Sequence, residues 1–144
     1  TGAVVIIATT DDDRIVLVEQ FRTPLGKSVI ELPAGLVGDE AGQDDALTAA
    51  RRELLEETGY RAESVEIVME GPTSAGLSDE VVTLVRARGL TKAADGGGVG
   101  HEEITAHTIP LPQAEPWLFA RMREGVAVDP KVFAGLYFAA DDRR

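Results

Sequence analysis

Glu31-Leu-Pro-Ala-Gly-Leu-Val37 and Arg52-Glu-Leu-Leu-Glu-Glu-Thr-Gly-Tyr60 are the two stretches that decide the fold of this chain. Residues three and four apart on a helix share a face, so Glu53 lies beside Glu56 and Glu57 in the predicted helix. Two carboxylates about 4 Å apart repel by about 4 kcal/mol at an effective dielectric near 20. Divalent cations remove that repulsion, because carboxylate oxygens are ligands that Mg²⁺ and Mn²⁺ prefer. A solvated acidic face at a helix end is the alternative, and the spacing alone leaves both interpretations open.

The neighbouring residues favour a functional helix. Arg52 adjoins the acidic cluster and can orient one carboxylate through a forked hydrogen bond. Gly59 directly after Thr58 is typical of a helix C-terminus, and Asp44 or Asp45 is a suitable N-cap. An apolar stripe at helical spacing completes the pattern, formed by Ala46, Leu47, Ala50, Leu54 and Leu55. The sequence therefore predicts a helix over residues 45–58.

The second stretch resembles the second half of the Nudix box, G-x5-E-x7-R-E-U-x-E-E-x-G-U, where U is apolar or aromatic. That box marks hydrolases of nucleoside diphosphates linked to another moiety. Counting back from Arg52 places Asp44 at the first Glu of the box and Gly38 at its Gly. Residues 31–37 instead resemble the strand end that carries the box Gly in the ADP-sugar pyrophosphatase branch, so we expect Gly35 to be its equivalent. If residue 44 is only a helix cap, Asp in place of the Glu of the box is tolerated. If residue 44 is a ligand, the change from Glu to Asp is a loss of that ligand.

The resemblance implies a metal site on the predicted helix. Its expected ligands are the carboxylates of Glu53, Glu56 and Glu57 and the backbone carbonyl of Ala34, and its expected ion is Mg²⁺, with Mn²⁺ as an alternative. The number of ions is left open. Glu56 and Arg52 are also expected to act in catalysis.

A glycine run, residues 95–100, precedes a pair of acidic residues, Glu102 and Glu103. No Lys-Ser/Thr follows the run, so we predict a mobile hinge rather than a phosphate-binding P-loop. A flexible loop that ends in carboxylates is where a lid delivers a catalytic base. The pair resembles the loop Glu of the family, and Glu102 is the better match because Ile104 follows two places later. Two exposed acids before a strand are the alternative.

The resemblance also implies residues that bind substrate. Residues 19–22, Glu-Gln-Phe-Arg, resemble the ADP-sugar branch, where an Arg at this place touches the substrate phosphate. Arg22 is therefore expected to contact the diphosphate, and Gly35 and Ser78 are further expected contacts. In that branch a Pro precedes the Gly-x-Ser segment, whereas here Ala75 stands in its place, which leaves the exact nucleotide sugar open.

Composition limits the classes of function. The chain has 144 residues, which predicts a single domain, residues 1–144. Its start at Thr1 rather than Met is compatible with a missing N-terminal extension. The net charge of −11 argues against nucleic acid or a membrane as a partner. The sequence has no Cys, which excludes disulfides and zinc-thiolate sites, and no apolar run of the roughly 20 residues that span a bilayer. A cytoplasmic enzyme is expected.

The order of elements predicts an α/β/α sandwich, in which helices cover both faces of a mixed sheet, as in Nudix domains. Strands are predicted at residues 3–8, 14–21, 27–33, 64–70, 81–88 and 104–109. Loops are predicted at residues 34–43 and 71–80, and two further helices at 112–124 and 131–140. His101 and His107 are predicted to be surface or structural residues, because no Cys or second His at metal-site spacing accompanies either.

Two classes of function remain. The favoured one is a metal-dependent pyrophosphatase that converts a nucleotide sugar such as ADP-ribose to AMP and ribose 5-phosphate. The alternatives are a housecleaning hydrolase of nucleoside triphosphates or dinucleoside polyphosphates, and a catalytically silent module that binds a nucleotide. The complete carboxylate set favours an enzyme. Members of the ADP-sugar branch form dimers in which N-terminal aromatics help hold the adenine in the partner's site; that region is short or absent here, yet we still expect a homodimer.

Overall fold

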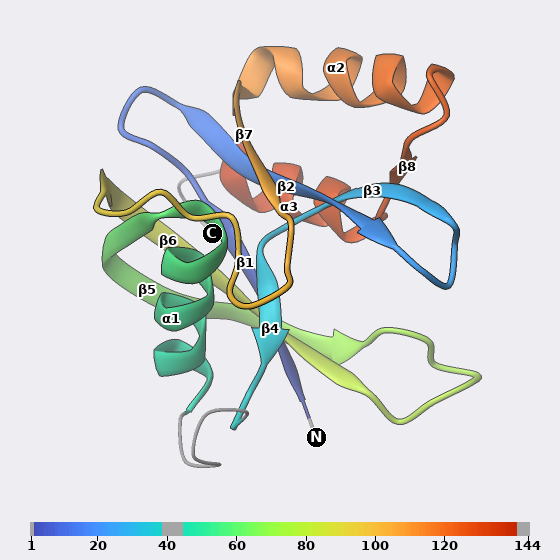
Figure 1. Ribbon diagram of the computed structural model, residues 1–144. Helices are drawn as coiled ribbons and strands as arrows, with labels where there is room; N and C mark the ends of the chain where they lie inside the picture. Colours follow the sequence, from blue (N-terminus) through green and yellow to red (C-terminus); the bar gives the residue numbers. More distant parts are fainter. Residues whose placement is uncertain (1, 39–44, 141–144) are drawn as a thin grey trace.

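The computed structural model describes residues 2–38 and 45–140. Over these residues the chain forms two four-stranded sheets and three helices (Figure 1). The elements in chain order are β1 (Ala3–Ala8), β2 (Arg14–Arg22), β3 (Lys27–Glu31), β4 (Ala34–Leu36), α1 (Ala46–Thr58), β5 (Tyr60–Pro72), β6 (Val81–Lys92), β7 (Thr105–Pro110), α2 (Leu111–Arg123), β8 (Ala127–Val128) and α3 (Lys131–Ala140).

The first sheet has the strand order β4-β1-β6-β5 and is mixed. Its strand β1 pairs in antiparallel fashion with β4 and in parallel with β6. Residues 4–8 of β1 are buried on both faces of the sheet, as their uninterrupted apolar run predicts for a central strand. Val5 and Ile7 face one core, and Val4 and Ile6 face the other. The two cores therefore lie on opposite faces of this sheet.

The helices cover those two faces. Ala49, Ala50 and Leu54 of α1 pack into the core that contains Val4 and Ile6. Residues of α2 and α3, among them Leu118 and Val132, pack into the other core. Figure 1 shows α1 beside β5 and β6, with α3 on the far side of β1. The predicted α/β/α sandwich is confirmed.

The predicted mixed pairing is present, but the strands are divided between two sheets, because β2 leaves β1 to form a second sheet with the order β7-β2-β3-β8. The turn between β1 and β2 contains Asp13 in the left-handed conformation, with φ of 58°. A single bridge between Thr9 and Ile15 links the two strands, and beyond it they diverge. Each strand then pairs along both edges with other strands, β1 with β4 and β6, and β2 with β3 and β7.

The boundaries of the helices follow the sequence signals. Asp45 is the N-cap of α1, and its side chain accepts a hydrogen bond from the backbone N–H of Thr48 at 2.7 Å. Gly59 ends the helix with φ of 79°. Asp44 lies outside the described residues, so its role as cap or ligand stays a prediction. The predicted helices that end the chain are confirmed as α2 and α3.

The bounds of several strands differ from prediction, because backbone pairing with a neighbouring strand includes residues that the alternation of apolar and polar residues does not mark as strand. Residues 34–36 form β4 rather than the start of a loop, because their backbone pairs with β1. β5 and β6 continue to Pro72 and Lys92, beyond the predicted ends, as a long antiparallel pair with one bulge between Ile67 and Met69. β8 has two residues, which is too short to show any period. Within the described residues, no helix is long and apolar enough to span a membrane.

Candidate active site

A pocket of about 430 Å³ lies where α1, β4, the end of β2 and the loop before β7 meet. Most of the residues that the sequence predicted for the site line it: Arg22, Ala34, Gly35, Glu53, Glu57 and Glu102. Gln20 and Leu36 are further lining residues that the sequence did not indicate. The fold therefore brings three carboxylates and one guanidinium to a single hollow.

Glycine at position 35 allows α1 to approach β4. A Cβ atom at Gly35 would overlap the carboxyl group of Glu53. Gly35 is therefore required for the position of Glu53, whatever contact it makes with a substrate. Gly38, the glycine found by counting back from Arg52, takes a left-handed φ of 81° after β4.

Glu57 is the most deeply buried carboxylate of the pocket, with a relative exposure of 5%. It accepts a hydrogen bond from the backbone N–H of Ala34 at 3.3 Å. Burial raises the pKa of Glu57 to about 8, and the charges of Glu53, Glu102 and Glu31 act in the same direction. The buried carboxylate is thus poorly compensated by the protein alone.

Arg52 compensates only part of the cluster. Its Nη1 donates to Oε1 of Glu53 at 2.8 Å and lies 3.8 Å from Oε2 of Glu56. Its Nη2 donates to the carbonyl of Leu36 at 3.4 Å, which ties the guanidinium to the end of β4. Burial still raises the pKa of Glu53, despite the opposing effect of Arg52. The predicted orienting contact of Arg52 is therefore made to Glu53.

The donor set fits a hard divalent cation. Glu53, Glu56 and Glu57 offer carboxylate oxygens on one helix, and a cation would relieve the unfavourable ionisation of Glu57. As the side chains stand, no three acidic, His or Cys side chains of residues 2–38 and 45–140 converge into a formed metal cage. Binding of one ion by all three carboxylates would need these side chains to turn toward it.

Arg22 stands at the edge of the same pocket. Its Nε and Nη2 donate to the two oxygens of Glu31 at 2.8 and 2.9 Å, which is a bidentate fork. The fork holds the pKa of Arg22 above its usual range. The sequence did not reveal Glu31 as a partner, because the two residues lie nine positions apart on neighbouring strands and are not paired in the register of β2 and β3, which joins Arg22 to Lys27 and Glu31 to Val18.

The loop that carries Glu102 is fastened to the C-terminus of α1. The backbone N–H of Gly97 donates to the carbonyl of Glu57 at 2.9 Å, and that of Gly98 donates to the carbonyl of Glu56 at 2.9 Å. These carbonyls lie in the last turn of the helix, where carbonyls lack an intrahelical partner. Oε1 of Glu102 accepts a hydrogen bond from the N–H of Val99 at 2.8 Å. We call residues 96–102 the glycine strap.

The mobility of this segment stays a prediction, but the structure shows that the glycine strap has close contacts of its own. Gly96 and Gly98 have φ of 76° and 93°, so both need glycine. A Cβ at Gly96 would lie 2.6 Å from the carbonyl carbon of Thr58, and one at Gly98 would lie 2.5 Å from Cβ of Glu102. The glycines serve close approach to the helix and to Glu102.

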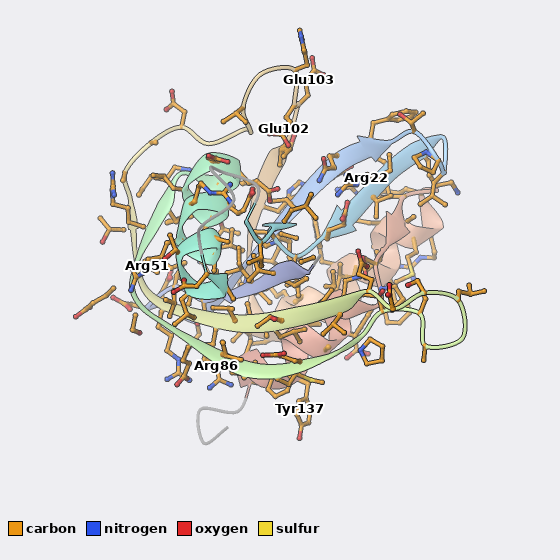
Figure 2. All side chains as sticks on the ribbon, turned by 90° about the horizontal axis from the view of Figure 1, so that it is seen from below. Arg22, Arg51, Arg86, Glu102, Glu103 and Tyr137 are labelled. Carbon is orange, nitrogen blue, oxygen red and sulfur yellow. The ribbon has the colours of Figure 1, made fainter. Side chains whose placement is uncertain are left out.

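Other predicted residues lie in different places. Glu103 does not line the pocket, and Figure 2 shows it farther out on the loop than Glu102. Ser78 lies on the loop between β5 and β6, where its Oγ accepts from the N–H of Glu80 at 3.3 Å, and it does not line the pocket. His107 contacts other side chains of the protein. Its Nε2 lies 2.9 Å from Oε1 of Glu19, and the centroid of its ring lies 5.0 Å from that of Trp117.

Comparison with known proteins agrees with this geometry. The family model of the NUDIX domain matches residues 1–127. A methanol dehydrogenase activator of Bacillus methanolicus is 46% identical over 103 residues, which cover 72% of this chain and 54% of that protein. An ADP-ribose pyrophosphatase of Mycobacterium tuberculosis is 37% identical over 138 residues, which cover 94% of this chain and 63% of that protein.

A solved structure, described as the crystal structure of an ADP compounds hydrolase, matches with a TM-score of 0.69 and 21% identity. The match covers 81% of this chain and 60% of that one, and it supports the fold. The chain spans about half to just under two thirds of the length of the curated relatives described above.

Proposed function

Because the chain belongs to the Nudix family, we propose that it hydrolyses the pyrophosphate bond of a nucleoside diphosphate sugar, such as ADP-ribose, to AMP and ribose 5-phosphate. The observation that carries this proposal is the pocket in which Glu53, Glu57 and Glu102 face Arg22. The negative charges of these poorly compensated carboxylates favour the binding of a cation. The guanidinium of Arg22 at the edge of the pocket favours the binding of an anion. A diphosphate with its cation satisfies both. The relative named an ADP-ribose pyrophosphatase supports the class of substrate.

The residues of the pocket take distinct roles in this reaction. Glu53, Glu56 and Glu57, with the Ala34 carbonyl, would hold a divalent cation, for which we propose Mg²⁺; when bound, it would polarise phosphorus and lower the pKa of water. Arg22 binds the diphosphate oxygens and keeps them in place. Arg52 orients Glu53.

Glu102 is assigned as the general base. Its Oε1 is engaged by Val99, so Oε2 receives the proton of the attacking water. The water oxygen forms a bond to one phosphorus, and the bond from that phosphorus to the bridging oxygen breaks. The bridging oxygen leaves on the second phosphate, which gives a nucleoside monophosphate and a sugar phosphate.

A panel of substrates tests the proposal. The chain is incubated with ADP-ribose, GDP-mannose, ATP and a dinucleoside polyphosphate, each with Mg²⁺, Mn²⁺ or a chelator, and the products are separated by anion exchange. We expect a nucleoside monophosphate from the nucleotide sugars and none in chelator. Turnover of ATP or the dinucleoside polyphosphate alone would move the protein to the housecleaning class, and turnover of nothing would favour a silent nucleotide-binding module.

We also propose a homodimer, which the resemblance to the ADP-sugar branch supports. Exposed apolar side chains such as Phe21, Leu25 and Leu36 offer surface for such an interface. Light scattering at micromolar concentration should give twice the mass of the chain. A monomer alone would overturn the proposal.

A further inference from the structure

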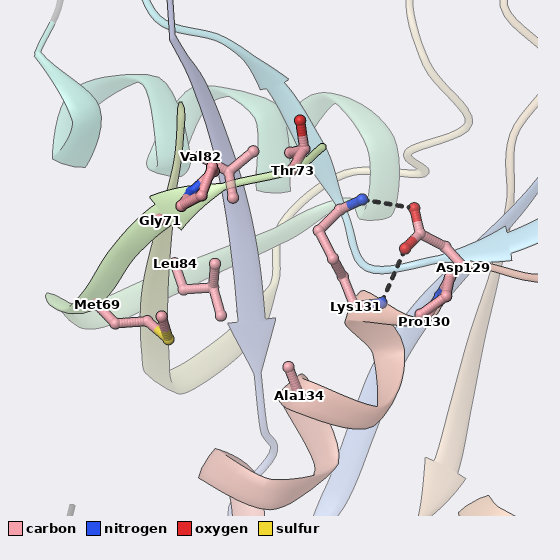
Figure 3. A pocket seen from close by; sticks show the side chains of 10 residues that line it. Met69, Gly71, Thr73, Val82, Leu84, Asp129, Pro130, Lys131 and Ala134 are labelled. Atoms are coloured by element: carbon pink, nitrogen blue, oxygen red, sulfur yellow. Dashed lines mark hydrogen bonds and ion pairs between the residues drawn. The ribbon is translucent and has the colours of Figure 1, made fainter. Parts of the chain in front are cut away.

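A second hollow, of about 250 Å³, lies where the N-terminal end of α3 meets β5 and β6 (Figure 3). Its walls are largely apolar, with contributions from Met69, Pro72, Val82, Leu84 and Ala134. Figure 3 shows Met69, Leu84 and Ala134 around one end and Thr73 with Lys131 at the other. The catalytic assignments above do not use this hollow.

A third hollow, of about 230 Å³, lies between the apolar pocket and the active site and shares wall residues with both. It shares Arg22 and Ala34 with the carboxylate pocket. It shares Thr73, Asp129 and Lys131 with the apolar pocket. The three hollows therefore adjoin one another between Glu57 and Ala134, and we call them together the groove.

The middle of the groove is polar, and its carboxylates outnumber its cations. Arg22 is held by Glu31, and Nζ of Lys131 lies 2.8 Å from Oδ2 of Asp129. Glu80 accepts a hydrogen bond from Oγ1 of Thr73 at 2.9 Å. Carboxylate oxygens of this kind accept hydrogen bonds from hydroxyl groups and repel a further phosphate. The middle segment therefore suits a neutral sugar.

We propose that this groove is the nucleoside subsite, with the ribose beside Asp129 and the base in the apolar pocket of Met69, Leu84 and Ala134. The inference rests on the proposed function and deepens it. A base is a planar ring that gains from burial of its faces against apolar walls, whereas the sugar at the other end of the substrate does not.

Binding of free nucleosides tests the subsite without the reaction. Adenosine and guanosine are titrated into the metal-free chain, and the methyl signals of Val82 and Leu84 are followed by NMR. We expect at least one of the nucleosides to shift both signals, with no need for Mg²⁺. Ribose 5-phosphate should leave them unchanged. Shifts from ribose 5-phosphate alone would reverse the orientation and overturn the proposal.

Two pairs of variants give the matched controls. Ala134→Leu adds three carbons to the wall, and Ala140→Leu makes the same change at the exposed end of the same helix. Met69→Glu places a charge in the apolar pocket, and Ile67→Glu places one on the same strand outside it. Ala134→Leu and Met69→Glu should weaken nucleoside binding and raise KM by at least about tenfold with little change in kcat, while the controls stay near wild type.

The outcomes separate this inference from the proposed function. Nucleoside binding that Ala134→Leu and Met69→Glu leave unchanged would overturn the subsite, even if the chain hydrolyses nucleotide sugars. A chain that binds nucleosides in the groove but hydrolyses no nucleotide sugar would keep the subsite and fail the reaction. Melting temperatures identify a variant that has not folded, and the other pair then decides.

Discussion

The pocket receives its carboxylates from two regions that are built in different ways. α1 carries Glu53, Glu56 and Glu57 on a regular helix with an N-cap and a terminal glycine. The glycine strap carries Glu102 and, over residues 96–102, has no helix or strand, yet its backbone is bonded to the last turn of α1. A helix is held in place by its own regular hydrogen bonds. The comparison shows that an irregular segment can be held as well, by hydrogen bonds to the carbonyls that a neighbouring helix leaves without a partner in its last turn.

The largest effect is expected at the helix. Glu57→Gln removes the most buried expected ligand, so the cation and its several kcal/mol of transition-state stabilisation are lost. We expect kcat/KM to fall by more than about a hundredfold and Mg²⁺ to stop raising the melting temperature. Glu103→Gln is the control, because Glu103 does not line the pocket. Unchanged metal affinity and rate in Glu57→Gln would refute the assignment.

The strap carboxylate is expected to matter almost as much. Glu102→Gln removes the general base and should lower kcat by about 10²–10⁴, whereas Glu103→Gln should have little effect. Side-by-side measurement of kcat separates the two residues. A loss at Glu103 alone would shift the assignment by one position. Two near-normal rates would leave the strap without a catalytic role and make Glu53 or Glu56 the next candidate.

Arg22 lies outside both α1 and the glycine strap. Its substitution tests whether the carboxylates of these two regions act on the same bound diphosphate. Arg22→Ala removes a charged hydrogen bond to the diphosphate, which corresponds to about 10- to 100-fold in kcat/KM. The fold should survive, because this side chain is 45% exposed. Steady-state kinetics and a melting curve measure both effects. An unchanged kcat/KM would make Arg22 an ordinary surface residue.

Two glycines of the strap offer a matched pair. Gly98 and Gly100 have φ of 93° and 62°, so an Ala at either position strains the backbone. A Cβ at Gly98 would also meet Glu102, whereas one at Gly100 would meet no atom within 4 Å. Both variants should lower the melting temperature, and Gly98→Ala alone should lower kcat, by about tenfold. Equal losses of kcat would show that the strap does not position Glu102.

A further effect concerns the metal-free protein. The pKa of Glu57 is about 8 in the folded chain against an ordinary value of 4.5, so the folded state keeps a proton that the unfolded state releases between these pH values. The free energy of unfolding should therefore fall as pH rises through this window, by up to about 1.4 kcal/mol per pH unit. Urea denaturation in chelator measures it. Glu57→Gln should lack this slope, and a slope equal to wild type would assign it to another group.

The sequence predicted the parts of the site that depend on local signals. The capping residues, the apolar stripe and the spacing of Glu53, Glu56 and Glu57 define α1 without reference to any other element. The fork between Arg22 and Glu31, the strand β4 and the contacts of Gly97 depend on which segments meet, and no local period encodes that. The close approach of the glycine run could not be predicted for the same reason, because Gly96 lies against Thr58 and Gly98 lies against Glu102.

The attachment of the strap makes its length matter more than its composition. Gly98 is fixed to the carbonyl of Glu56, and Glu102 follows four positions later. One inserted or deleted residue changes the reach of a chain by up to about 3.5 Å, which exceeds a hydrogen-bond length. Surface loops normally tolerate such changes. Here the number of residues between Gly98 and Glu102 sets the distance from the helix to the general base. Among functional sequences we therefore expect substitutions at Val99 or His101 and no change in this spacing.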